Sequence, residues 1–378
     1  MSAAQEAADC MVVGGGLVGV SLAYGMALAG GRVVVIDEGD DAIRASRGNF
    51  GLVLVQSKGY GLPSYARWTL QSAALWPGFA RQLEHATGID LQLRQNGGYW
   101  FGFSDAEVED RVRVLSALRS DAGIPFETLA PDELRARLPG IGPAVVGGTF
   151  CPLDGHVNPL LLLRALYTLL PRHGIELING APVRELAPCD GFFVARAGGR
   201  SVRARRVVLA AGLGNRALGA AVGLNVPVVP NRGQILVTER LKPFLHCMTN
   251  KIRQTMDGTV QLGSTEENVG LDDRNTEQGM RELARRAVAT FPRLARARVV
   301  RAWAALRVMT PDGFPIYQES ATCPGAFVIT CHSGVTLAAA HACRVAPWII
   351  GKAPRPEGTE DFTALRFERR IEDAASVQ

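Results

Sequence analysis

A glycine-rich turn near the start of the chain has the residue types and the spacing that bind a dinucleotide. Gly14, Gly16 and Gly19 fit the pattern G-x-G-x-x-G, and Asp37 follows at the end of the next apolar run. The first glycine permits a sharp turn, the second lets the backbone approach a pyrophosphate, and the third lets helix and strand pack closely. N–H groups at the start of the following helix attract the anion, and the Asp37 carboxylate can accept hydrogen bonds from a ribose hydroxyl. The residues that we expect to contact a dinucleotide in this region are Gly14, Gly16, Leu17, Val18, Gly19, Asp37 and Glu38.

The elements predicted around the turn are those that this pattern requires. An apolar run at residues 10–13 predicts a strand, and small and apolar residues at helical spacing over 17–29 predict a helix. A β-branched run at 32–36 predicts a second strand. A glycine-rich turn in an unrelated fold would lack this order of elements, so we interpret the region as a Rossmann-like unit.

The turn alone does not distinguish FAD from NAD, and a second segment bears on that choice. Residues 206–214 predict a strand that ends in small residues, among them Ala211 and Gly212. FAD proteins of the glutathione-reductase-like type carry such a strand, whose small residues let the chain pass near the cofactor. A buried strand ending in an ordinary glycine turn would give the same pattern. We take Ala211 and Gly212 as further candidate contacts of FAD.

Two kinds of predicted structure alternate along the rest of the chain. Helices are expected at 63–84, 105–122, 131–138, 158–173, 276–290 and 336–350. Strands are expected at 97–103, 175–178, 183–186, 192–196, 233–238, 252–256, 259–262, 302–307 and 326–330. We therefore expect an α/β fold with a discontinuous FAD-binding, Rossmann-like (glutathione-reductase-like) lobe, residues 1–85, 150–225 and 320–378. The substrate lobe, residues 86–149 and 226–319, is expected to hold a mixed or antiparallel sheet.

Composition excludes several other classes of protein. The chain has 378 residues, of which 47% are hydrophobic and 20% charged, and a net charge of +5 that comes from scattered arginines. This pattern is more typical of a solvated surface than of a nucleic-acid site. Seven cysteines show neither C-x-x-C pairs nor metal-ligand spacing, which predicts reduced thiols and no metal site. With no signal peptide and no membrane-spanning run expected, we predict a cytoplasmic protein that meets a membrane at most peripherally, at its inner face through partners.

Several segments in a fixed order make the chain resemble the D-amino-acid-oxidase family of flavoproteins. They are residues 14–19 with Asp37, then 45–52, 154–159, 207–214, 303–307 and 332–337. The resemblance spans nearly the whole chain, and its specificity lies in their order and spacing. Within the family, segments 307–316 and 331–337 look most similar to the smaller flavin (beta) subunits of heteromeric dehydrogenases. That group includes D-hydroxyproline dehydrogenase, opine (octopine or nopaline) oxidase and hydrogen cyanide synthase.

The resemblance implies further contacts with FAD. By motif matching, the residues that would line the pyrophosphate and flavin are Ser46, Arg47, Asn49, Gly51 and Leu52, and Val183 would lie beside the adenine. A turn would place a helix N-terminus near the N1–C2=O edge of the flavin, where the reduced ring carries negative charge. The residues of that turn are Gly334, Val335, Thr336 and Leu337.

The resemblance also implies two candidate catalytic residues. Arg307 ends a predicted strand at the position where related oxidases keep a carboxylate-binding arginine, whose planar fork matches a carboxylate. His332 precedes the turn at the flavin edge and is either a contact of substrate or ring, or a structural residue. Related sarcosine oxidases attach their flavin through a cysteine after the equivalent strand. This chain has Val308, Met309 and Thr310 there, so we predict non-covalent FAD.

The resemblance implies oxidation of the C–N bond of a small amino or imino acid to an imine, with hydride transfer to flavin N5. D-Hydroxyproline or an opine is the favoured substrate, and the electrons would pass to an alpha subunit, with or without a small ferredoxin-like subunit. A glycine- or sarcosine-type oxidase and a cyanide-forming glycine dehydrogenase are alternatives. A tRNA-modifying flavoprotein, or a subunit that binds FAD only for structure, is a more distant alternative.

Overall fold

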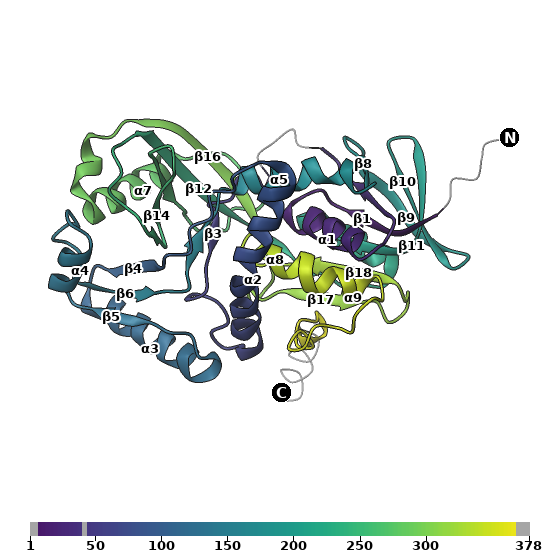
Figure 1. Ribbon diagram of the computed structural model, residues 1–378, viewed down its shortest axis with the longest axis horizontal. Coiled ribbons are helices and arrows are strands. Elements are labelled where there is room, and N and C mark those ends of the chain that lie inside the picture. Colours follow the sequence, from purple (N-terminus) through teal and green to yellow (C-terminus); the bar gives the residue numbers. More distant parts are fainter. Residues whose placement is uncertain (1–6, 40–43, 368–378) are drawn as a thin grey trace.

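A sheet of parallel strands carries the glycine turn. The computed structural model describes residues 7–39 and 44–367 (Figure 1). Within the sheet, β1 (Ala8–Val13) lies between β2 (Val33–Ile36) and β11 (Arg200–Leu209). β18 (Ala326–Thr330) extends it beyond β11, and β8 (Glu176–Ile178) extends it beyond β2. Because these strands are parallel, the residues that follow β1, β2, β11 and β18 meet at one edge.

Antiparallel strands extend the same sheet. β9 (Val183–Cys189) and β10 (Phe192–Ala197) form a hairpin that pairs with the first half of β11. β17 (Ile316–Glu319) pairs with β18 at the opposite edge. The range 226–319, which we expected in the substrate lobe, includes β17. Hydrogen bonding with β18 places this strand in the parallel sheet instead.

The parallel sheet is buried on both faces. Cys10 and Val12 of β1 pack into one hydrophobic cluster, and Met11 and Val13 pack into another on the opposite face. This division follows from the alternation of side chains along a strand. It explains why β1 is an uninterrupted apolar run with no polar residue at every second position.

Helices cover the face of the sheet next to the glycine turn. α1 (Leu17–Leu28) packs against α5 (Pro159–Arg172) and against the C-terminal helical segment. That segment consists of α8 (Ala338–Ala340), the π-helical turn η4 (His341–Val345) and α9 (Ala346–Ile349). The single helix predicted over 336–350 therefore begins two residues later and contains a π turn. A strictly α-helical pattern does not reveal such a turn.

α2 (Pro63–Thr87) lies between the two halves of the molecule (Figure 1). Its Ser72 hydroxyl and Trp76 indole donate hydrogen bonds of 2.7 and 3.0 Å to the carbonyl of Thr336. These bonds fix the turn that precedes α8 against α2. The backbone at residues 334–337 is thereby held in place from outside the parallel sheet.

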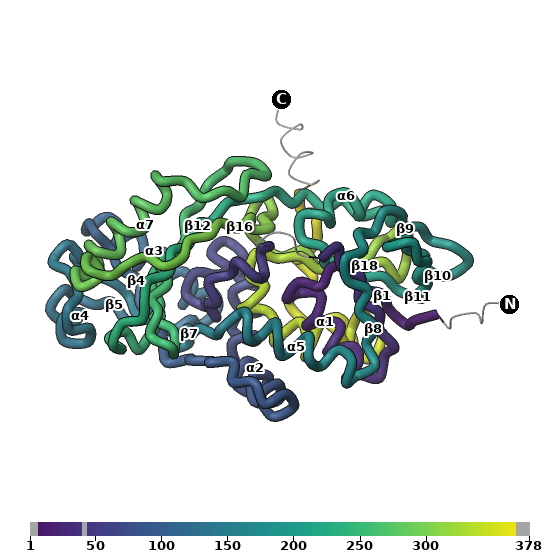
Figure 2. Tube along the Cα trace, turned by 90° about the horizontal axis from the view of Figure 1, so that it is seen from above, coloured from purple at the N-terminus to yellow at the C-terminus, as the bar shows by residue number. Residues whose placement is uncertain are grey.

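The second half of the molecule contains two four-stranded sheets. The first has the order β14 (Ile252–Gln254), β15 (Thr259–Gly263), β12 (Val229–Arg240) and β16 (Val299–Met309), all antiparallel. The second has the order β13 (Met248–Thr249), β4 (Gly98–Gly102), β6 (Gly147–Cys151) and β5 (Glu127–Leu129). Seen from above, α4 (Pro131–Arg137), β5 and α7 (Glu277–Thr290) lie at one end of the molecule and β9 to β11 at the other (Figure 2). A third hydrophobic cluster fills this half.

The remaining elements are short or lie on the surface. They are β3 (Leu52–Val53), β7 (Gly155–His156), α3 (Asp105–Ala122), α4 (Pro131–Arg137), α6 (Asn215–Gly219), α7 (Glu277–Thr290) and the 3-10 turns η1 (Gly212–Gly214), η2 (Ala220–Val222) and η3 (Pro292–Arg296). Residues 1–6 and 368–378, at the ends of the ranges expected for the FAD-binding lobe, and residues 40–43 within it, lie outside the described residues. Within the described ranges, no helix combines the length and the apolar character needed to cross a membrane.

Candidate functional site

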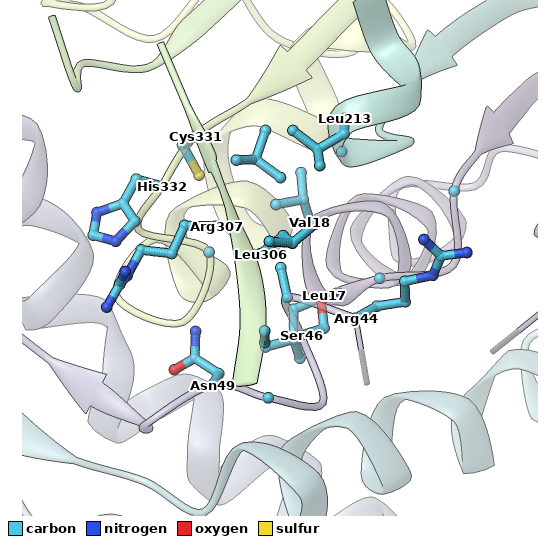
Figure 3. Close-up of a pocket in the computed structure, with 18 of the residues that line it drawn as sticks. Leu17, Val18, Arg44, Ser46, Asn49, Leu213, Leu306, Arg307, Cys331 and His332 are labelled. Atoms are coloured by element: carbon cyan, nitrogen blue, oxygen red, sulfur yellow. Dashed lines mark hydrogen bonds between the residues drawn. The ribbon is translucent and has the colours of Figure 1, made fainter. Parts of the chain in front are cut away.

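One elongated cavity runs from the edge of the parallel sheet to the sheet of β12 and β16. Its volume is about 580 Å³, within the range of roughly 300–1,000 Å³ that is usual for ligand sites. Arg307 and His332 lie side by side at one end, and Arg44 lies at the opposite end (Figure 3). Apolar side chains, including Val18 and Leu306, lie between the two ends.

The glycine turn forms the wall at the Arg44 end. Gly14 has φ +112°, a value that favours glycine, and a Cβ on it would collide with the carbonyl of Ala210 at the end of β11. A Cβ on Gly19 would collide with the carbonyl of Gly14. The turn, α1 and β11 are therefore packed backbone against backbone. Side chains larger than hydrogen at these two positions have no room.

Asp37 braces this turn. Its carboxylate accepts hydrogen bonds from the backbone N–H of Gly15 at 2.5 Å and of Gly39 at 2.9 Å. Each carboxylate oxygen retains a second lone pair, so the side chain can still accept a bond from a ligand hydroxyl. Tyr167 of α5 donates a bond of 2.8 Å to the carbonyl of Gly15. Nothing in the sequence pattern pointed to Tyr167, because it lies far from the turn along the chain.

A loop after β2 closes over the N-terminus of α1. The Ser46 hydroxyl accepts a bond of 2.9 Å from the N–H of Leu17, and the Asn49 side chain accepts one of 2.7 Å from the N–H of Gly51. Trp303 of β16 donates a bond of 3.2 Å to the carbonyl of Gly48. The loop is thus tied to both halves of the molecule. It forms one side of the cavity along much of its length.

Most of the residues predicted from the sequence line this cavity. Those that do are Gly14, Gly16, Leu17, Val18, Asp37, Glu38, Ser46, Asn49, Leu52, Val183, Ala211, Gly212, Arg307, His332, Gly334, Val335 and Thr336. Gly19, Arg47, Gly51 and Leu337 do not line it. Gly51 packs against the carbonyl of Val157, Leu337 is fully buried, and Arg47 is exposed. Neighbours in a motif therefore divide between the cavity wall and the packing behind it.

Arg307 is half-buried on β16, directly opposite Asn231 of β12. Its Nη1 donates to the side chain of Asn231 at 2.7 Å and to the carbonyl of Arg232 at 3.1 Å. Its Nη2 donates to the Ser264 hydroxyl and, at 2.7 Å, to the carbonyl of Thr265. Both terminal nitrogens thus already have protein acceptors. Burial lowers the pKa of Arg307, but the guanidinium remains charged near neutral pH.

Lys58 lies beside His332 in the same region of the cavity. Its Nζ is 3.5 Å from His332 Nδ1. Burial, with a smaller contribution from the positive charge of Arg307, lowers the pKa of Lys58 to about 8. Burial, followed by the charges of Lys58 and Arg307, lowers the pKa of His332 well below its usual value, so this imidazole is neutral. Lys58 was not predicted from the sequence.

Lys251 lines the cavity as well. Its Nζ donates a bond of 2.8 Å to the carbonyl of Ser264 and lies 3.5 Å from a carboxylate oxygen of Glu266. Burial lowers its pKa. The chain has only four lysines among its 41 basic residues, and two of the four line this cavity. That rarity was a signal in the sequence that could have drawn attention to Lys58 and Lys251.

Sequence comparison identifies the family. Residues 9–348 match the pattern of the FAD-dependent oxidoreductases called DAO. The chain belongs to this family of FAD-dependent oxidoreductases. The family is the one that the sequence motifs resembled, and the enzyme class and the FAD cofactor follow from it.

Individual relatives cover nearly the full length of this oxidoreductase. An opine oxidase subunit of Rhizobium meliloti is 42% identical over 363 residues, 95% of this chain and 98% of the relative. The corresponding opine oxidase subunit of Agrobacterium tumefaciens (strain Ach5) is 41% identical over 362 residues, 95% of this chain and 97% of the relative. The crystal structure of glycine oxidase from Geobacillus kaustophilus superposes with a TM-score of 0.87 at 26% identity, covering 95% of this chain and 98% of that one.

The lining of the cavity in this oxidoreductase fits FAD. At one end, the tight backbone of Gly14 and Gly16 and the N-terminus of α1 suit a pyrophosphate. Apolar side chains in the middle suit a flat ring, and small residues after β11 let it approach the sheet. Cationic side chains at the far end suit an anionic substrate. Size, shape and charge therefore all agree with a bound flavin dinucleotide.

Proposed function

We propose that this chain oxidises the C–N bond of a small amino or imino acid, with an opine or D-hydroxyproline as the favoured substrate. The observation that carries the proposal is the charge at one end of the cavity, where Arg307 and Lys58 lie together. The two relatives named as opine oxidase subunits support an opine. When bound, FAD supplies the acceptor for a hydride from the carbon next to nitrogen.

Arg307 would hold the substrate carboxylate. The carbonyls of Arg232 and Thr265 fix the plane of its guanidinium, and the side chains of Asn231 and Ser264 complete its bonds. Side-chain acceptors can rotate away, whereas backbone carbonyls cannot. A bound carboxylate would therefore replace the bonds to Asn231 or Ser264 and leave the orientation of the guanidinium unchanged.

FAD would be held without a covalent bond. Cys331 lines the cavity, but burial raises the pKa of its thiol to about 12. A thiol attacks only as the thiolate, so Cys331 is a poor nucleophile at neutral pH. At the strand end where related sarcosine oxidases carry the attaching cysteine, this chain has Val308 and Met309. Acid precipitation should release all the flavin into the supernatant.

The chain would act as the flavin subunit of a heteromeric dehydrogenase. Both opine oxidase relatives are named as subunits of their enzymes, which supports a partner here. An alpha subunit would then receive the electrons. Affinity purification of the tagged full chain from its native host should recover a second flavin- or iron-sulfur-binding polypeptide in a fixed ratio. Recovery of the chain alone, fully active with oxygen, would contradict this role.

Anaerobic reduction of the bound flavin tests the reaction without any partner or electron acceptor. The full chain, loaded with FAD, is mixed with octopine, nopaline, cis-4-hydroxy-D-proline, glycine and sarcosine in turn. We expect an opine or D-hydroxyproline to bleach the oxidised flavin band fastest. Faster bleaching by glycine would favour the second candidate, a glycine-type oxidase, which the similarity to glycine oxidase supports. If none of these compounds bleaches the flavin, the proposed reaction is wrong.

A further inference from the structure

Lys58 differs from the other cations of the cavity in what surrounds it. Its Nζ lies 3.5 Å from the neutral ring of His332, and no carboxylate forms an ion pair with Lys58 among the described residues. Arg307 and Lys251 instead donate to protein oxygens at 2.7–3.1 and 2.8 Å. The ammonium of Lys58 has three N–H donors, and His332 can accept only one. At least two donors are therefore available to a ligand.

The backbone that carries Lys58 is held firmly. Buried Asp154 accepts bonds from the N–H groups of Val55 and Gln56 at 2.6 and 3.1 Å. Arg111 donates to the carbonyl of Gln56 at 2.8 Å, and Thr336 anchors the preceding residues through Leu54 at 3.2 Å. Lys58 is thus presented from a rigid loop, and its position does not depend on a flexible surface segment. Rigid presentation is typical of a recognition group.

The charges near Lys58 are incompletely balanced. Burial disfavours its ammonium, and so does the positive charge of Arg307, while Cys331, Glu266 and Asp154 offset these effects only in part. Both effects are relieved when an anion enters between the two cations. One substrate carboxylate would occupy Arg307 under the proposed function. A second anionic group on the same substrate is then the chemistry that Lys58 fits.

We propose that Lys58 binds a second carboxylate and thereby makes the cavity selective for secondary amines that carry two carboxylates. The inference rests on the proposed function, because it assigns the first carboxylate to Arg307. It explains a lysine facing the cavity in a chain that otherwise uses arginine for almost all of its positive charge. His332 acts as a positioning residue, since its neutral nitrogen accepts one N–H and directs the others into the cavity.

Equilibrium binding of two matched, non-oxidisable probes tests the proposal. Diglycolate carries two carboxylates on an ether oxygen, and methoxyacetate has a methyl group in place of one of them. Calorimetry on the FAD-loaded full chain compares wild type, Lys58→Met, Lys58→Arg and the exposed control Lys352→Met. In Lys58→Met, we expect diglycolate affinity to fall about tenfold to 100-fold and methoxyacetate affinity to stay within about threefold. Lys58→Arg should recover part of the loss, and Lys352→Met should bind as wild type.

Equal losses for both probes in Lys58→Met, or no loss for either, would overturn the proposal. Equal losses would indicate that Lys58 acts on the shared part of the ligand, for example as a base for the amine. Kinetics with iminodiacetate and sarcosine, which differ in the same way, should show the same selective loss in kcat/KM. If diglycolate binding depends on Lys58 while no amine bleaches the flavin, this inference stands and the proposed function fails. If amines bleach the flavin without selectivity for two carboxylates, only this inference fails.

Discussion

The two ends of the cavity differ in the chemical groups that form their walls. At the dinucleotide end, the glycine turn forms much of the wall, and the carboxylate of Asp37 and the hydroxyl of Ser46 already have backbone partners. At the substrate end, the wall consists of ionisable side chains, and Arg307, Lys58 and Lys251 all have pKa values lowered by burial. The first end binds the dinucleotide through its shape, which residues close together in the sequence determine. The second binds through partly buried charges that a ligand can balance.

This difference separates the consequences of substitution. Changes at the dinucleotide end should alter whether FAD is bound, because they disturb the packing of the turn. Changes at the substrate end should leave FAD in place and alter which molecules react with it. Single substitutions at each end, with matched controls, can show whether the two ends are independent in this sense.

The largest effect is expected at Gly14. Gly14→Val imposes a Cβ where the carbonyl of Ala210 lies and a φ of +112° on a β-branched residue. We expect the variant to purify without flavin and to unfold at a lower temperature, with a strain of about 1–3 kcal/mol in addition to the collision. Absorbance measures the flavin content, and thermal melting measures the unfolding temperature. Gly30→Val is the control, because Gly30 has φ +86° but an added Cβ meets nothing within 4 Å. It should lose stability and keep its flavin.

The next largest effect is expected at Arg307. Arg307→Met should keep FAD and lower kcat/KM for the substrate by about 100-fold or more, because it removes a charged, two-pronged partner of the carboxylate. Flavin content and steady-state kinetics are measured on the same sample. Arg301→Met, an exposed arginine on the same strand, is the control and should behave as wild type. Loss of flavin in Arg307→Met would show that the two ends are not independent.

A smaller effect is expected at Asp37. Asp37→Ala removes the acceptor for the N–H groups of Gly15 and Gly39 as well as the predicted contact with the ribose. We expect FAD affinity to fall about tenfold, in line with the roughly 1–2 kcal/mol of such bonds. Fluorescence titration of the apoprotein with FAD gives the affinity. Glu185→Gln should change it little, because Glu185 pairs with Arg196 at an exposed position and does not line the cavity. Unchanged affinity in Asp37→Ala would contradict the role given to this residue.

The smallest effect is expected from pH. With a pKa lowered to about 8, Lys58 is charged below that value and loses its charge as the pH rises through it. The preference for diglycolate over methoxyacetate should therefore shrink above about pH 8 in wild type and persist in Lys58→Arg. The ionisable groups near Lys58 are His332, Cys331, Arg307, Glu266 and Asp154. A preference that stays constant to about pH 10 in wild type would contradict the assignment to Lys58, whose ammonium would be neutral there.

The dinucleotide end was largely predictable from the sequence, because its information is local. Gly14, Gly16 and Asp37 belong to one strand-turn-helix-strand unit, and each has a steric or hydrogen-bonding reason to be that residue type. Long elements with regular periodicity were also predictable, and α3 at Asp105–Ala122 and β18 at Ala326–Thr330 are confirmed. The strands β3, β7 and β13 were missed, since two residues show no periodicity, and the longer strands β5, β6 and β17 were also missed.

At the substrate end, only the residues that belong to a family motif could be predicted from the sequence. Arg307 and His332 came from the family resemblance, whereas Lys58 lies in a loop whose position depends on Asp154, Arg111 and Thr336 from distant parts of the chain. Contacts between residues that lie so far apart in the chain leave no pattern in a single sequence. Gly51 and Leu337 do not line the cavity, although their neighbours in the same motifs do. The reason is again long-range packing, because contacts with other elements decide which side of a loop faces the cavity.

A crystal structure of the chain with FAD and methoxyacetate is the measurement that tests the central claim most directly. We expect the pyrophosphate at the turn of Gly14, Gly16 and Gly19, and the probe's carboxylate on the guanidinium of Arg307, with the bond to Asn231 or Ser264 displaced. A pyrophosphate bound elsewhere would contradict the claim. So would a carboxylate held away from Arg307 while that guanidinium keeps all its present protein partners.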